Sequence, residues 1–280
     1  MVPWQFFKWM TARIKAEFPG TCFIGEVYEK ENYPLYLNEA GFDYLYDKSG
    51  LYDSLRAIVE NRGSSRCITW NWQSLGDMQP RMLNFLENHD EQRFASDYFG
   101  GDASRTFAAL AVSLYFNEAP FMIYCGEEVG ERAMDAEGFS GRDGRTTIFD
   151  WWSVPSLRRL YDHVHSGKGL SGNEADILSE FRRTLHLADS HRALVGGKTF
   201  DLCYCNMASP GFDPDRHFAF LRGDGSETVL FVCNFSPDPA NVRISVPDEA
   251  ISCLHIKKTE PFSLNVSVPS DSFTAVVLPV

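Results

Sequence analysis

The sequence predicts an α/β fold in two parts: parallel βα units over residues 1–194 and a small antiparallel β-sandwich over residues 195–280. Two observations support this prediction. Short apolar runs alternate with helical segments up to about residue 194, which is the spacing of βα units around a parallel sheet. After Gly196 the pattern changes to short strands of alternating polarity, separated by turn residues.

The chain begins with a predicted helix over residues 3–18, which Pro19-Gly20 ends. Apolar side chains three or four residues apart give it one buried stripe, formed by Trp4, Phe7, Met10, Ile14 and Phe18. The run at 21–27 is short and almost continuously apolar, which is typical of a strand covered on both faces. Further strands are expected at 42–46, 81–87 and 120–125. Helices are expected at about 50–61, 103–116 and 173–193, with a polar loop containing tryptophan before residue 81.

Six strands are expected after Gly196: FDLCYC (200–205), HFAFLR (217–222), TVLFVCNF (228–235), ANVRISV (240–246), FSLNVSV (262–268) and SFTAVVLPV (272–280). Turn signals such as Ser209-Pro210-Gly211 separate them. In the first of these strands, Cys203 and Cys205 would share one face, which suits apolar thiols better than a zinc site.

Composition disfavours several classes of function. The formal net charge of −12 disfavours binding to nucleic acid and to anionic membranes. No run of 18 apolar residues is present and the first residues do not form a signal peptide, so the sequence predicts no membrane span and assigns no compartment.

Two carboxylates follow predicted strands of the first part. Glu26 ends the apolar run TCFIG, and Asp90 follows RMLNFLE. The carboxyl ends of parallel strands meet on one face, so two acids placed there can converge on one glycosidic bond. The alternative is that each acid caps a helix or pairs with a nearby arginine.

Asn88-His89-Asp90 is a more specific signal, because it places an amide, an imidazole and a carboxylate at one strand end. The amide and the imidazole can hydrogen-bond sugar hydroxyls, and the carboxylate can stabilise a developing positive charge. The alternative interpretation is a hydrogen-bonded turn that ends the strand.

Five stretches together resemble the α-amylase family of glycoside hydrolases, in the family's order. FIGEVY (23–28) is similar to its acid-bearing strand motif, and FLENHDEQR (85–93) to its His-Asp motif. The other three are GFDYLYDKSGLYDSLR (41–56), YCGEEVG (124–130) and GRTTIFDWW (144–152).

The resemblance implies the last four βα units of a (β/α)8 TIM barrel, followed by the family's C-terminal β-sandwich. It implies a retaining hydrolase or transglycosylase that acts on α-1,4-glucosidic bonds of an α-glucan or maltooligosaccharide. By motif, Glu26 is the general acid/base, Asp90 stabilises the transition state and His89 binds a sugar hydroxyl. Asn88, Tyr28 and Arg93 are the further candidates for substrate binding.

Two motifs of the family are missing, and one of them is the Asp-x-x-x-x-Asn-His motif of the third strand. The other carries the nucleophile, an aspartate in Gly-Phe-Arg-x-Asp on the fourth strand, and this sequence contains no such stretch. We therefore expect the chain to begin after that strand and to be inactive alone. Replacement by Asp43, Asp47 or Asp77 is disfavoured, since their surroundings do not resemble the family's nucleophile site. The alternative function is a carbohydrate-binding or scaffold protein that does not cut, and an unrelated βα protein is a distant third.

No metal or cofactor is predicted for this chain. Glu127-Glu128 is a weak cation candidate, because no third ligand stands near it in the sequence. The resemblance makes calcium possible in a full-length protein. Half a barrel also leaves two apolar strand edges open, at 21–27 and 120–125, so we expect the chain to self-associate or to rearrange in part to cover them.

Overall fold

The computed structural model describes residues 2–135, 142–146, 154–258 and 260–278. Four parallel strands form the first sheet in chain order: β1 (Ile24–Gly25), β2 (Tyr44–Tyr46), β3 (Met82–Phe85) and β4 (Phe121–Met122). Parallel strands in chain order, joined by helical crossovers, are the arrangement of part of a (β/α)8 barrel. The predicted α/β class and partial barrel are therefore confirmed.

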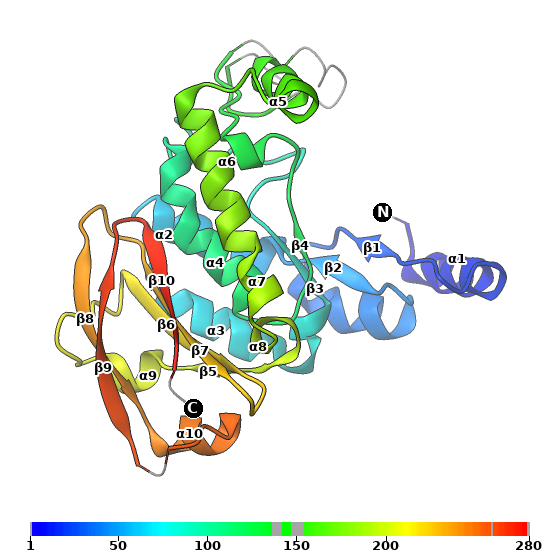
Figure 1. Ribbon diagram of the computed structural model, residues 1–280. Coiled ribbons are helices and arrows are strands. Elements are labelled where there is room, and N and C mark those ends of the chain that lie inside the picture. Colours follow the sequence, from blue (N-terminus) through cyan, green and yellow to red (C-terminus); the bar gives the residue numbers. More distant parts are fainter. Residues whose placement is uncertain (1, 136–141, 147–153, 259, 279–280) are drawn as a thin grey trace.

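Some helices pack beside this sheet, and others lie between it and the antiparallel sheet or extend beyond it (Figure 1). The helices are α1 (Trp4–Glu17), α2 (Asp53–Val59), α3 (Arg66–Leu75), α4 (Phe107–Tyr115), α5 (Pro155–Ser166), α6 (Gly172–Leu185), α7 (Leu187–Ser190) and α8 (Ala193–Gly196). Within the described ranges, no helix combines the length and the apolar character that crossing a bilayer requires.

The N-terminal segment is less buried than the sequence predicted. Helix α1 forms as expected, but its apolar stripe is only partly covered and Phe18 is exposed. Strand β1 is two residues long, and Ile24 is 50% exposed, so the prediction of a strand covered on both faces was wrong. The reason is position: β1 is an edge strand paired only with β2, and α1 projects beside it, away from the body (Figure 1).

The predicted tryptophan-containing loop is in fact helix α3. Its buried side chains Ile68, Asn71 and Leu75 are three and four residues apart, which is a helical stripe. The buried asparagine interrupts the apolar pattern, and for that reason sequence periodicity missed the helix. Helix α2, expected from about residue 50, begins at Asp53 after one wide turn over Lys48–Tyr52.

The C-terminal region is an antiparallel β-sandwich, as predicted. One sheet has the order β10-β7-β6-β5 and the other pairs β8 with β9. The strands are β5 (Lys198–Asp201), β6 (His217–Gly223), β7 (Thr228–Asn234), β8 (Ala240–Val246), β9 (Phe262–Val268) and β10 (Ser272–Val277). Side chains of the two sheets, such as Leu230 and Ile244, share one buried cluster, to which α10 (Asp248–Leu254) contributes.

The expected strand FDLCYC is only partly a strand. Strand β5 ends at Asp201, and the next residues form the short helix α9 (Cys203–Asn206). Cys203 and Cys205 therefore do not share a strand face. The side chain of Asp201 accepts the backbone N–H of Cys203, which turns the chain out of the sheet. The division of the chain at residue 194 stays a prediction, with β5 beginning at Lys198.

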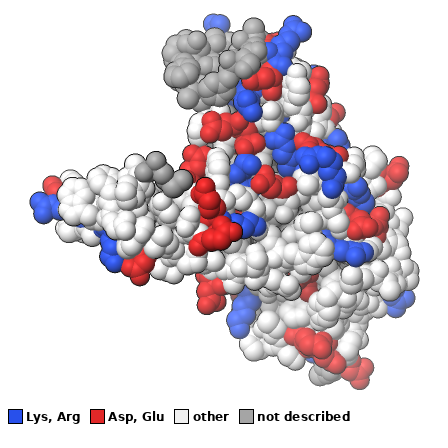
Figure 2. Space-filling model, turned by 180° about the vertical axis from the view of Figure 1, so that it is seen from behind, with Lys and Arg blue, Asp and Glu red and all other residues white. Residues whose placement is uncertain are grey.

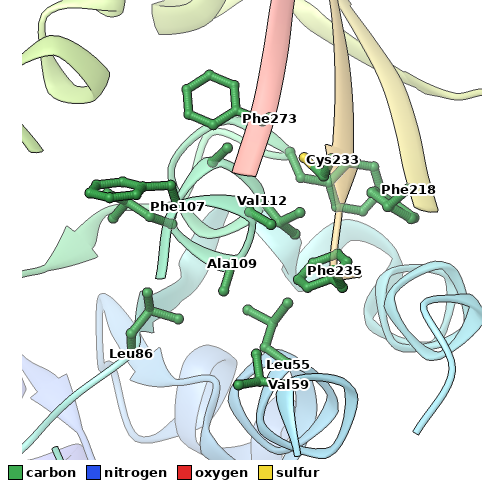
Figure 3. Close-up of a cluster of buried hydrophobic side chains, with 14 of the residues drawn as sticks. Leu55, Val59, Leu86, Phe107, Ala109, Val112, Phe218, Cys233, Phe235 and Phe273 are labelled. Carbon is green, nitrogen blue, oxygen red and sulfur yellow. The ribbon is translucent and has the colours of Figure 1, made fainter. Parts of the chain in front are cut away.

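Helix α4 joins the two regions through one continuous core. Every residue of α4 except Leu114 is buried. Figure 3 shows its side chains between Leu55 and Val59 of α2 on one side and Phe218, Cys233 and Phe273 of the antiparallel sheet on the other. Burial of apolar surface on all sides of α4 makes the parallel sheet and the sandwich one packing unit.

A buried arginine adds a polar link across this junction. Arg222 on β6 is fully buried, and its guanidinium donates to three backbone carbonyls, those of Tyr115 (2.9 Å), Asn117 (2.8 Å) and Gly197 (2.6 Å). Burial lowers the pKa of Arg222 to about 10. The charge is tolerated because the carbonyl dipoles replace part of its hydration.

We predict that Arg222→Met lowers the free energy of unfolding by about 2–4 kcal/mol, since it leaves three buried carbonyls without donors. Urea denaturation at fixed pH measures this. The control is Arg62→Met, which removes a largely exposed arginine and is expected to change stability by less than about 0.5 kcal/mol. If the two substitutions lower the free energy of unfolding equally, the contacts of Arg222 with the carbonyls do not contribute to stability.

Candidate active site

Three of the residues singled out in the sequence meet at the carboxyl ends of the parallel strands. Glu26 follows β1, and His89 and Asp90 follow β3. One carboxylate oxygen of Glu26, one of Asp90 and a ring nitrogen of His89 lie within 4.8 Å of one another. His89 Nε2 is 3.5 Å from Asp90 Oδ2. Glu26 and Asp90 are exposed and His89 is partly exposed, so a ligand can reach all three.

Tyr28 belongs to the same group. Its hydroxyl donates a hydrogen bond to Glu26 Oε1. Partial burial, with the Glu26 carboxylate beside it, raises the pKa of Tyr28, so the phenol stays protonated and able to donate. The hydroxyl of Ser49 donates to the backbone carbonyl of Tyr28 at 2.7 Å and fixes this segment. Tyr28 therefore orients the acid while its ring remains exposed.

Asn88 lies beneath this surface. Its Oδ1 accepts the backbone N–H groups of Asp90 (2.9 Å) and Glu91 (2.8 Å), which closes a tight turn after β3. The residue is buried, and its Nδ2 has no hydrogen-bond partner in the described part of the chain. The structure thus gives Asn88 the turn-forming role of the alternative interpretation, and that turn presents His89 and Asp90.

Arg93 also lies below the surface rather than in a cleft, being 1% exposed. Its guanidinium donates to Glu87 Oε2 (2.6 Å), Thr146 Oγ1 (2.7 Å) and the Cys125 carbonyl (2.8 Å). These contacts join the ends of β3 and β4 to the segment at 142–146. Arg93 is therefore placed to hold the turn of the site from below, and its contact with substrate stays a prediction.

Lys48 was not singled out in the sequence. It follows β2 and pairs with Asp53 (2.8 Å) and Glu91 (3.3 Å). Its ammonium lies 5.8 Å from the ring centre of Tyr28. Its position just after a strand end could have predicted a place in the site. A lysine near several acids, however, is more often part of an ordinary surface ion pair.

The acids considered as replacements for a nucleophile are engaged elsewhere. Asp43 pairs with Lys15 at 2.7 Å and accepts the Phe23 N–H. Asp47 is buried and accepts from Asn71 at 3.2 Å. Asp77 lies in an exposed turn after α3. None of these three shares the cluster formed by Glu26 and Asp90.

Within the described ranges, no third ligand joins the Glu127-Glu128 pair. Among the described residues, the group with ligand spacing is Glu26, His89 and Asp90. Glu127 is buried, and its Oε2 accepts the Tyr124 N–H at 3.1 Å. Glu128 Oε2 accepts the Gly126 N–H at 2.9 Å. Both carboxylates therefore shape the loop after β4. The GRTTIFDWW stretch lies largely outside the described residues, since 147–153 are not described.

A groove of about 350 Å³ opens beside Glu26. Apolar side chains line most of it, among them Phe7, Ile24, Val27 and Phe42. In Figure 2 the projecting N-terminal segment is mostly uncharged on the face shown, and acidic side chains gather where it joins the body. Glu26 thus stands at the border between an apolar wall and an acidic surface.

Comparison with known proteins finds relatives of both regions of the chain. The family described as alpha amylase, C-terminal all-beta domain, matches residues 213–277. A cyclomaltodextrinase of Geobacillus thermopakistaniensis (strain MAS1) is 22% identical over 279 residues, which are 96% of this chain and 42% of that protein.

Two solved structures show the same fold at low sequence identity. The α-amylase from H. orenii superposes with a TM-score of 0.63 and 16% identity, over 97% of this chain and 56% of that one. The cyclic α-maltosyl-(1→6)-maltose hydrolase from Arthrobacter globiformis gives a TM-score of 0.66 and 15% identity, over 99% of this chain and 54% of that one. The chain thus spans about half the length of the proteins that it matches.

We predict a pH-dependent loss of stability from Glu127. Burial, with Glu87 nearby, raises the pKa of Glu127 well above the ordinary value of 4.5. As pH rises, Glu127 ionises in the unfolded chain before it ionises in the folded one. Its contribution to the free energy of unfolding is therefore complete below pH 4.5 and is lost as pH rises through the raised pKa. The loss is at most about 1.4 kcal/mol per pH unit.

Urea denaturation of the wild type and of Glu127→Gln at several pH values between 4 and 8 tests this. The free energy of unfolding of the variant should rise relative to wild type as pH increases. Glu128→Gln, which removes the same charge next door, is the matched control. A difference between Glu127→Gln and wild type that does not change with pH would contradict the prediction.

Proposed function

We propose that this chain supplies the acid/base and charge-stabilising residues of an α-glucan hydrolase site. The chain resembles the α-amylase family along nearly its whole length, and residues 213–277 match that family's C-terminal all-β domain. The observation that carries the proposal is the convergence of Glu26, His89 and Asp90 within 4.8 Å. The relatives named cyclomaltodextrinase and α-amylase support an oligosaccharide or polysaccharide of glucose as the ligand.

In the proposed reaction each residue has one task. Glu26 protonates the glycosidic oxygen as the bond to the leaving sugar breaks. The Tyr28 hydroxyl, bound to Glu26 Oε1, keeps the other carboxyl oxygen free to face the substrate. Asp90 lies close enough to stabilise the positive charge that grows on the anomeric carbon, and His89 binds a hydroxyl of the same sugar.

A retaining mechanism also needs a nucleophile whose carboxyl group is about 5–5.5 Å from the acid. The Gly-Phe-Arg-x-Asp motif that would carry it is absent from this sequence. The chain alone would therefore bind glucan and not cut it, whether the reaction of a complete site is hydrolysis or transglycosylation. Binding without cleavage as the natural function, in a carbohydrate-binding or scaffold protein, is the second candidate and rests on the same missing motif.

We predict that the isolated chain binds maltoheptaose and that His89→Ala weakens this binding about tenfold, ~1.4 kcal/mol, through one lost hydrogen bond in a partly exposed site. Isothermal titration calorimetry measures the affinity. His186→Ala, which removes an exposed histidine far along the chain, is the control and should leave the affinity unchanged. If His89→Ala and His186→Ala change the affinity equally, His89 does not bind the glucan as proposed.

In the same preparations, release of reducing sugar from soluble starch and of fluoride from α-maltosyl fluoride should stay at the uncatalysed rate. The proximity of Glu26 and Asp90 makes this a strict test, because their spacing is close to that of a retaining pair. Hydrolysis above the uncatalysed rate, lost in Glu26→Gln and in Asp90→Asn, would contradict the prediction that the chain alone does not cut.

Self-association through the open strand edges is also proposed. Ile24 on β1 is 50% exposed and Ile123 beyond β4 is 38% exposed, at opposite edges of the parallel sheet. An edge strand presents unpaired backbone groups next to these apolar side chains.

Light scattering should therefore give a mass above that of one chain, and Ile24→Lys should lower it, because a charge on an edge strand opposes pairing. Val195→Lys, at an exposed apolar residue outside the parallel sheet, should not. A compact monomer at high concentration would exclude this association.

A further inference from the structure

A second groove lies between the βα units and the sandwich. It has a volume of about 290 Å³ and is lined by residues of α3 and of the segment around α9. These two elements lie near each other beside the antiparallel sheet (Figure 1). The groove shares no lining residue with the one beside Glu26. Its size is at the lower end of small-molecule sites.

Two large aromatic side chains are exposed in this groove. Trp70 of α3 is 62% exposed and Tyr204 of α9 is 57% exposed, and Met207 adds a third exposed apolar group. Exposed aromatic rings on both sides of one groove form an apolar patch of the kind that marks a ligand-binding groove. Helix α3 buries its opposite stripe in the core, so folding alone does not require a tryptophan at position 70.

The walls of the groove are held rigidly relative to each other. Ser65, at the start of α3, donates through its hydroxyl to the carbonyls of Pro214 (2.8 Å) and His217 (2.7 Å). The hydroxyl of Thr69 donates to Asp201, at the end of β5. These bonds cross between the two regions of the chain, so the groove is formed before any ligand arrives, which reduces the entropy cost of binding.

The polar groups of the groove suit a neutral ligand rich in hydroxyl groups. Arg66 lies 3.6 Å from Asp215, so its charge is balanced there. The Gln73 side chain is exposed at the rim, and none of the described residues hydrogen-bonds its amide. Aromatic faces between amide and guanidinium donors match a pyranose ring, which has apolar faces and a hydroxylated edge. A balanced charge disfavours a nucleic acid or an acidic peptide.

We propose that this groove is a second α-glucan site, in which Trp70 and Tyr204 stack on glucose rings while Gln73 and Arg66 bind hydroxyl groups. It would hold a distant part of the same polymer whose bond lies at Glu26. The identity of the sugar rests on the function proposed above, whereas the groove and its aromatic walls do not.

The test is retention in native gels that contain amylopectin, with calorimetric titration of maltoheptaose beside it. Trp70→Ala should reduce retention about tenfold, and Trp70→Phe should keep most of it, because an aromatic face remains. Trp9→Ala is the matched control: it removes an equally exposed tryptophan from helix α1 and should not change retention. Tyr204→Ala gives an independent variant on the other wall, and thermal unfolding of each variant shows that it is folded.

The outcomes separate the two proposals. Retention that falls in Trp70→Ala and Tyr204→Ala and is reduced further by His89→Ala supports both sites. Retention that falls with the aromatic substitutions but not with His89→Ala supports the groove and overturns the proposed function. Retention unchanged in folded Trp70→Ala and Tyr204→Ala overturns the second site, and the exposed aromatics would then fit a protein partner instead.

Discussion

Burial of helix α4 on all sides is the constraint on which the rest of the structure depends. This short helix packs against β3 of the parallel sheet, against β7 and β10 of the antiparallel sheet and against α6. Water reaches α4 only around Leu114, so removal of this helix would expose both sheets at once. The orientation of the sandwich relative to the strand ends follows from this contact.

The site depends on a second, smaller layer of buried polar contacts. Glu87 and Arg93 form an ion pair that is almost inaccessible to solvent, at a cost in desolvation that only further hydrogen bonds offset. Those bonds reach the carbonyl of Cys125 and the hydroxyl of Thr146, so they lock the turn between β3 and the chemistry-bearing residues. Asn88 closes the same turn from inside. His89 and Asp90 are thus presented by a rigid support, as precise binding requires.

Sequence patterns predicted the strands after residue 212 and the buried helix α4 well. In these elements the spacing of the apolar residues matches the faces that the element buries. The patterns failed where burial depends on neighbours: the run at 21–27 is apolar but lies at an edge, and α3 contains a buried asparagine. The placement of Glu26 with Asp90 was expected from strand ends meeting on one face. The burial of Arg93 and Asn88 was not, since a polar residue beside a motif looks the same whether it faces a ligand or supports the turn.

The most direct test of the account is a double-mutant cycle on maltoheptaose affinity, with Glu26→Gln, Asp90→Asn and both together. If the two carboxylates contact one ligand across less than 4.8 Å, their effects are coupled, and the double variant should differ from the sum of the single ones by at least about 0.5 kcal/mol. Strictly additive effects, or none in either single variant, would contradict the claim that these residues form one glucan site.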